Sequence, residues 1–120
     1  MSPQNTLDLL IECANNNDLD GIMALYDPEA VFTVSPGKVV KGIKAIRDIF
    51  AHILKLGVSV TIEKTAIIEA GDIATCINRV RIKGGGFGSD PLMAFDVLRR
   101  AADGKWLFVI DNGSGTGYLE

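Results

Sequence analysis

The sequence is poor in the residues that make disulfide, metal and nucleophile sites. It has only two cysteines and one histidine. Cys13 and Cys76 have no CxxC spacing, so we interpret them as small buried hydrophobic residues rather than as a disulfide or a metal pair. There is no HExxH, no GxSxG and no cluster of His and Cys, which disfavours metal and serine-nucleophile chemistry. We expect no metal and no cofactor.

Basic clusters and long apolar runs are also missing. Twelve Lys and Arg stand against 15 Asp and Glu, which gives a formal net charge of −3. Such a surface repels a phosphate backbone, so nucleic acid is not an expected partner. No run reaches the ~18 apolar residues of a membrane span, and Met1-Ser2-Pro3-Gln4-Asn5 does not resemble a signal peptide. We expect a cytoplasmic protein that does not enter the membrane.

What the sequence does contain is enough apolar material for one core. The chain has 120 residues, of which 48% are hydrophobic and 22% are charged, as in ordinary globular proteins. No long linker or change of composition divides it. We therefore predict a single domain over residues 1–120.

Helical patterns fill the first half of the chain. The i, i+3, i+4, i+7 spacing of Leu7, Leu10, Ile11 and Ala14 predicts a helix that ends near residues 15–17. Asp18 resembles the N-cap of a second helix, which Pro28 would end. The apolar face of that second helix would hold Leu19, Ile22, Met23 and Tyr26.

A short strand and a third helix come next. The β-branched and aromatic residues of 30–34 predict the strand, followed by a turn at Ser35-Pro36-Gly37. After Gly42 a strong apolar stripe predicts the third helix, with Gly57 as its C-terminal cap. That stripe consists of Ile46, Ile49, Phe50, Ile53 and Leu54.

From Ser59 the period changes to two, which predicts four strands at 59–70, 72–83, 91–102 and 105–113. Ala70-Gly71-Asp72 and Asp103-Gly104 are hairpin signals, so the strands should pair antiparallel. Helices followed by strands, without βαβ alternation, predict an α+β fold.

The segment Leu92 to Leu98 is apolar on both parities, so both faces of the sheet should be covered. Helices can cover one face, but no residues remain to cover the other. We therefore predict a homodimer through the outer sheet face, which would carry Met93, Phe95 and Val97.

Three segments together resemble a known family: residues 18–32, Gly42-Ile-Lys-Ala-Ile-Arg-Asp-Ile-Phe50, and Asp96-Val-Leu-Arg-Arg-Ala-Ala-Asp-Gly-Lys-Trp106. Their order and spacing are similar to those of the SnoaL-like group of the nuclear transport factor 2-like superfamily. The resemblance implies a cone, in which N-terminal helices pack on a curved, mainly antiparallel sheet around an internal pocket.

The chain also resembles ketosteroid isomerases of that superfamily, although it departs from their functional residues. Their general base would fall on Val34 or Ser35, and their donor tyrosine would fall near Leu10. Only the donor aspartate has a match, at Asp96. An epoxide-hydrolysing Asp-Arg-Asp site fits less well, because its arginine would fall on Ala94, although Arg79 or Arg81 on a neighbouring strand could supply the cation.

Asp96 is the strongest candidate residue, since its same-parity neighbours on the strand are apolar. It is either a structural aspartate paired with an Arg or a backbone amide, or a pocket residue. Asp111 alternates with Leu107 and Val109, and the other interpretation is a strand-end turn residue. A two-residue turn at Asp103-Gly104 would place Asp111 opposite Asp96, whereas a three-residue loop with a bulge would separate the two.

Other candidate residues have simpler explanations. His52 lies off the third helix stripe, which indicates a solvated side chain, and Tyr26 is more typical of core packing than of a pocket. The run Lys83 to Gly88 is either a flexible connection or a mobile rim with Phe87 at its tip.

Two functions follow from these observations. The first is a pocket protein that binds a small apolar or mixed ligand without chemistry, and the alternative is an acid–base isomerase, cyclase or hydrolase using Asp96 and Asp111. The predicted pocket lining is Tyr26, Val34, Phe50, Leu54, Arg79, Ala94, Leu98 and Val109.

Overall fold

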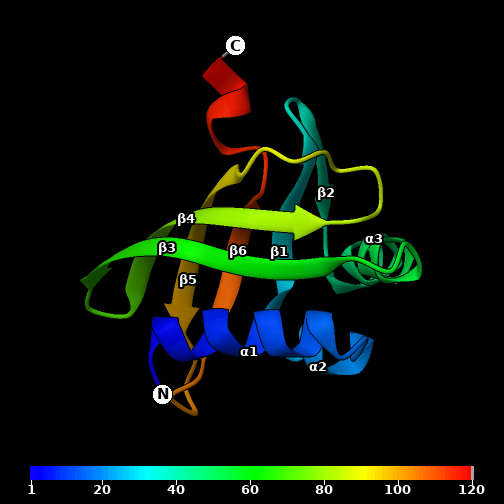
Figure 1. Ribbon diagram of the computed structural model, residues 1–120. Coiled ribbons are helices and arrows are strands. Elements are labelled where there is room, and N and C mark those ends of the chain that lie inside the picture. The colour runs from blue at the N-terminus through cyan, green and yellow to red at the C-terminus, as the bar shows by residue number, and fades with distance from the viewer. Residues whose placement is uncertain (120) are drawn as a thin grey trace.

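The computed structural model describes residues 1–119 and has three α-helices packed against a six-stranded, strongly curved sheet (Figure 1). The helices are α1 (Pro3–Asn15), α2 (Leu19–Met23) and α3 (Ile43–Lys55), and a 3-10 helix η1 (Gly115–Leu119) follows the last strand. The strands are β1 (Tyr26–Ser35), β2 (Lys38–Lys41), β3 (Ser59–Ala70), β4 (Ile73–Lys83), β5 (Leu92–Arg100) and β6 (Trp106–Asn112). The predicted α+β class is confirmed.

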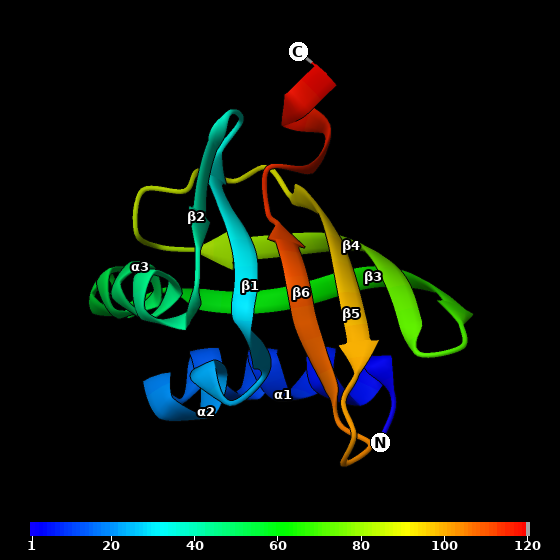
Figure 2. The ribbon, with the colours of Figure 1, turned by 180° about the vertical axis from the view of Figure 1, so that it is seen from behind.

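The sheet has the strand order β2-β1-β6-β5-β4-β3 (Figure 2). Every neighbouring pair is antiparallel except β1 and β6, which are parallel. The sheet is therefore mixed, and mainly antiparallel as predicted. The parallel pair is possible because β1 and β6 are far apart in the chain, since a parallel pair needs a long connection.

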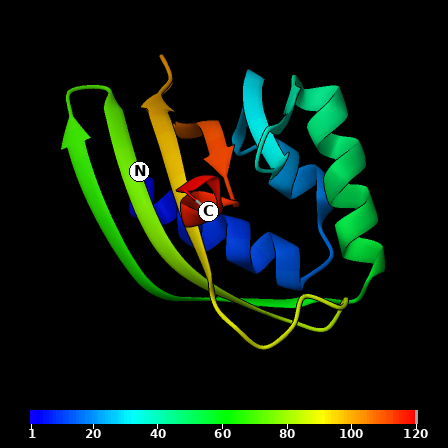
Figure 3. The same ribbon diagram turned by 90° about the horizontal axis from the view of Figure 1, so that it is seen from above.

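Seen from above, the sheet curls so that β3 and β4 lie opposite α3, with α1 across the base (Figure 3). Contacts of α1 with β3 and β6, and of α3 with β1 and β2, place all three α-helices on the concave side. The convex side, called here the outer face, has no α-helix on it. Among residues 1–119, no helix is both long enough and apolar enough to cross a membrane.

The predicted helix boundaries are mostly correct and are set by capping. Asp18 caps α2, because the backbone amide of Gly21 donates a hydrogen bond to its Oδ1 at 2.9 Å. Gly57 follows the last turn of α3 with φ of +69°, the left-handed conformation that glycine adopts without strain.

Tyr26 was assigned to the second helix, and this was wrong. Helix α2 ends at Met23 and Tyr26 is the first residue of β1, which contains Pro28. The strand tolerates proline there because its register with β6 shifts between Tyr26 and Val31, so the missing N–H breaks no regular ladder.

The sequence predicts only a turn after β1, whereas the structure continues that turn into the short strand β2. The turn Pro36-Gly37, with Gly37 at φ of +80°, brings Lys38 opposite Ser35 and continues into β2. Proline followed by a residue with positive φ is typical of a type II turn. The β2 strand has four residues and mostly exposed side chains, so it carries little hydrophobic signal.

The β5–β6 hairpin contains a β-bulge at Val109. Near the turn Leu98 pairs with Phe108, but the next pair is Val97 with Ile110, which leaves Val109 as the extra residue. Phe108 is fully buried on the inner side, and after the bulge Asp111 also points inward.

Candidate functional site

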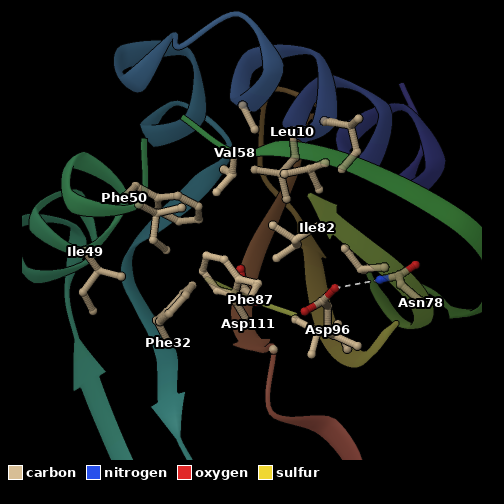
Figure 4. Close-up of a pocket in the computed structure, with 18 of the residues that line it drawn as sticks. Leu10, Phe32, Ile49, Phe50, Val58, Asn78, Ile82, Phe87, Asp96 and Asp111 are labelled. Atoms are coloured by element: carbon tan, nitrogen blue, oxygen red, sulfur yellow. Dashed lines mark hydrogen bonds between the residues drawn. The ribbon is translucent and has the colours of Figure 1, made fainter. Parts of the chain in front are cut away.

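A cavity of about 610 Å³ lies between α1, α3 and the concave face of the sheet (Figure 4). Most of its wall is apolar, because the helix stripes and the inward parity of β3 and β4 meet here. The apolar lining includes Leu7, Leu10, Ile11, Ala14, Phe32, Val34, Ile49, Phe50, Ile53, Leu54, Val58, Val60, Ile62, Val80, Ile82, Phe87, Leu92 and Ala94.

Polar groups line the cavity at separate places. Asp96, Asp111 and Asn78 are buried at the sheet, where Asn78 is only 1% exposed. Asp48 and His52, one turn apart on α3, are exposed side chains of the lining and mark its solvent side. At its inner end the cavity therefore has three neighbouring polar side chains, Asn78, Asp96 and Asp111, in an otherwise apolar wall.

Asp96 and Asp111 are directly opposite one another on β5 and β6. Their side chains are 5% and 9% exposed. Directly opposed residues of an antiparallel pair have Cβ atoms about 5 Å apart. Two buried carboxylates this close repel one another, which disfavours ionisation of both.

Neighbouring side chains hold this pair in place. The hydroxyl of Tyr26 donates a hydrogen bond to Oδ2 of Asp111. Asn78 Nδ2 donates to Oδ2 of Asp96 at 2.8 Å, and Thr65 Oγ1 in turn donates to Asn78 Oδ1. These side chains lie in a row across the concave face of the sheet, from β3 to β1.

One atom of the pair is unsatisfied. Asp96 Oδ1 is buried and accepts no hydrogen bond from a donor of the described residues. Buried polar atoms normally have partners, so an exception marks a functional candidate.

Burial is the main cause that raises the pKa of Asp96 well above that of an exposed aspartate, followed by the charge of Asp111 and the hydrogen bond with it. Burial also raises the pKa of Asp111, but the hydrogen bonds from Tyr26 and Asp96 oppose this increase. Burial, then the charge of Asp111, keeps the pKa of Tyr26 well above its usual value, so the phenol stays protonated.

The structure brings together both candidate aspartates and half of the predicted lining. Asp96, Asp111 and the apolar residues Val34, Phe50, Leu54 and Ala94 line the cavity. Tyr26 and Leu98 are buried in the core beside it, and Tyr26 reaches the site through its hydroxyl. The interpretation of Tyr26 as a core residue therefore holds together with a polar contact to the site.

Two further predicted lining residues, Arg79 and Val109, do not line the cavity. Arg79 is exposed and lies on the outer face, since its neighbours Asn78 and Val80 occupy the inward parity of β4. Val109 is displaced by the bulge, which breaks the alternation that was assumed to carry it inward with Asp111. Arg81 pairs with Glu63 at 2.9 Å, so neither arginine lies between the two aspartates.

Sequence reasoning missed Asn78 and the contribution of α1. Asn78 alternates with Cys76 and Val80 on the inward side of β4, and this polar residue in an apolar series was a readable signal. His52 is exposed as predicted, although it also lines the cavity. Among residues 1–119, no group of three His, Cys, Asp or Glu side chains could hold a metal ion.

The comparisons with known proteins agree with this architecture. A model of the SnoaL-like domain matches residues 8–109. A candidate ketosteroid isomerase from Shewanella frigidimarina is similar in structure, with a TM-score of 0.79, 17% identity and 89% of each chain covered.

Two further structures have the same fold. A candidate dehydratase of the nuclear transport factor 2-like family from Streptomyces avermitilis has a TM-score of 0.74 and 18% identity, over 90% of this chain and 88% of that one. A protein of unknown function from Pseudomonas putida, also nuclear transport factor 2-like, has a TM-score of 0.75 and 18% identity, over 90% of this chain and 80% of that one. No curated protein sequence matches. The family model covers most of the chain, and the protein belongs to the SnoaL-like domain family.

Proposed function

We propose that this protein binds a small, largely apolar molecule in the cavity, with the polar end of that molecule against Asp96 and Asp111. The observation that carries the proposal is a cavity of about 610 Å³ whose wall is apolar apart from a few grouped polar side chains. Small-molecule sites have volumes of roughly 300–1,000 Å³ and this kind of lining.

A second candidate function is acid–base catalysis on such a molecule. It is favoured by the contact between Asp96 and Asp111, because two carboxyl groups of unequal proton affinity can act as acid and base. Asp96 would donate a proton and Asp111 would accept one. Binding without chemistry remains our first proposal, since the described side chains that contact the pair, Tyr26 and Asn78, are both uncharged.

Fluorescence of the neutral apolar probe N-phenyl-1-naphthylamine tests the first proposal. Val60 lines the cavity, whereas Val39 on β2 is 52% exposed and outside the lining. Val60→Trp should fill the cavity and weaken probe binding by at least about tenfold, an effect of ~1.4 kcal/mol. Val39→Trp is the matched control and should bind as the wild type does. Equal binding by both variants would contradict a site in the cone.

We further propose that the protein is a homodimer through the outer face. This face exposes large apolar side chains, namely Ile68 at 69%, Ile77 at 45%, Ile73 at 42% and Ile110 at 39% exposure. Phe95 lies among them, paired with Ile77 on β4. A contiguous apolar surface of this kind is typical of a protein interface.

A cytoplasmic location is proposed as well. Both cysteines are free, with Cys76 buried and Cys13 half-buried, as is common in a reducing compartment. Fractionation of the producing cells, followed by immunodetection, tests this location.

A further inference from the structure

The charges around the cavity are all of one kind. The lining contains three carboxyl side chains, Asp48, Asp96 and Asp111, together with His52, and it contains no Lys or Arg. Arg79 is exposed on the other side of β4, and Arg81 is occupied by Glu63. An anionic ligand would leave water without meeting a counter-charge, which is costly in an apolar cavity.

The side-chain hydrogen-bond donors that contact Asp96 and Asp111 each already make a hydrogen bond to one of them. The Tyr26 hydroxyl binds Asp111, and Asn78 Nδ2 binds Oδ2 of Asp96. Oδ1 of Asp96 accepts no hydrogen bond from any donor of the described residues, although Asp96 is only 5% exposed. Asp96 lines the cavity, so a ligand that carries an N–H donor can approach its carboxyl group from there and provide what the protein does not.

The pair also lacks a counter-ion. The two carboxyl groups lie in an apolar wall, and no Lys or Arg of the described residues lines the cavity. The groups that face it are the phenol of Tyr26 and the amide of Asn78, both neutral, and the thiol of Cys76 directly across from Asp96 on β4. The pKa of that thiol is raised to about 12, mainly by burial, so it is neutral as well.

We propose that the ligand is an apolar amine whose protonated nitrogen binds at Asp96 and Asp111. This inference rests on the proposed ligand-binding function and names its chemical class. The nitrogen supplies both the missing donor and the missing positive charge, and the carbon skeleton fills the apolar part of the cone. Asp48 on the solvent side adds a negative charge that favours entry of a cation.

Calorimetric titration with four naphthalene compounds tests the proposal on the wild-type protein. The probes are 2-(aminomethyl)naphthalene, 2-(hydroxymethyl)naphthalene, 2-acetylnaphthalene and 2-naphthoate, which share a skeleton and differ in the polar end. Hydrogen bonds to a charged group are the stronger ones, so the amine should bind at least about tenfold tighter than the alcohol and the ketone. The naphthoate should bind weakest.

An isosteric variant separates charge from shape. In Asp111→Asn the advantage of the amine over the alcohol should fall by about tenfold or more, while alcohol affinity stays within about threefold. Asp96→Asn provides the same comparison if the first variant does not fold, and circular dichroism checks both.

The outcomes separate the two proposals. Alcohol, ketone or naphthoate binding as tightly as the amine would overturn the amine inference and leave the apolar binding site standing. Binding of none of the four compounds would contradict the binding function together with the inference. An amine preference that survives both Asn variants would place its nitrogen elsewhere and overturn the inference as well.

Discussion

Asp96 faces Asp111 across the β5–β6 hairpin, although the two strands are out of step near the turn. The ladder begins with Arg100 opposite Trp106, and the bulge at Val109 adds the one residue that brings the two aspartates level. The bulge also allows Phe108 and Asp111, three positions apart, to point to the same side. A structural irregularity thus creates the polar part of the cavity.

The first prediction concerns the protons of this pair. Carboxyl NMR titration should give Asp96 a pKa well above the ~3.9 of an exposed aspartate. In Asp111→Asn the pKa of Asp96 should fall, because the charge and hydrogen bond of Asp111 are lost, but it should remain raised because burial is the largest cause. A pKa near the exposed value in both proteins would leave the pair without an acid–base role.

The second prediction follows from linkage between protonation and folding. The folded-state pKa of Asp96 is raised, so its contribution to stability is fully present below the unfolded pKa and is lost as pH rises through the folded pKa. The free energy of unfolding of the wild type, relative to Asp96→Asn, should therefore decrease from pH 4 towards alkaline pH. Urea unfolding across this range measures the difference, in which the carboxyls that do not interact with Asp96 cancel, whereas Asp111 contributes together with Asp96. A constant difference would contradict the raised pKa.

The third prediction tests the homodimer. Light scattering at micromolar concentration should give twice the 12.9 kDa of one chain. Phe95→Asp should produce monomers, because a dimer would bury two uncompensated charges. Phe87→Asp, which introduces the same charge at an exposed loop residue, is the control and should remain dimeric. A monomeric wild type would remove the proposal.

The fourth prediction concerns steroid isomerisation. The position of the general base in ketosteroid isomerases falls on Val34 or Ser35, and neither side chain accepts a proton at neutral pH. The protein should therefore not convert a 3-oxo-Δ5 steroid to its conjugated isomer at a measurable rate, as followed by the absorbance of the conjugated enone. Appreciable turnover that disappears in Asp111→Asn would show that Asp111 serves as base.

The sequence predicted the elements whose signals are local. The stripe of α3 and its Gly57 cap are set by neighbouring residues, and the long strands β3 and β4 have a clear period of two. Tyr26 was misassigned because helix and strand both accept an aromatic residue there, and only pairing with β6 decides. Pairing across the sheet also placed Arg79 on the outer face.

The pair of aspartates was predicted correctly, but through a register that does not hold near the turn. A uniform two-residue hairpin was assumed, whereas the backbone amide of Gly104 donates to Ala101 and the strands start one residue out of step. Bulges depend on tertiary packing more than on local sequence, so the compensation at Val109 had no signal in the chain. Residues on the helices, such as Leu10, entered the lining because of the way α1 crosses the sheet.

The central position of β6 has a consequence for synthesis on the ribosome. Strands β2 and β1 form one half of the sheet, β5, β4 and β3 form the other, and only β6 joins them. Because β6 follows the other five strands in sequence, the two halves share no hydrogen-bonded ladder until β6 has been made. The hydrogen bond from Tyr26 to Asp111 cannot form until Asp111, 85 positions later in the chain, has been made. The contact between Tyr26 and Asp111, and with it the polar part of the cavity, therefore forms only after β6 has been made.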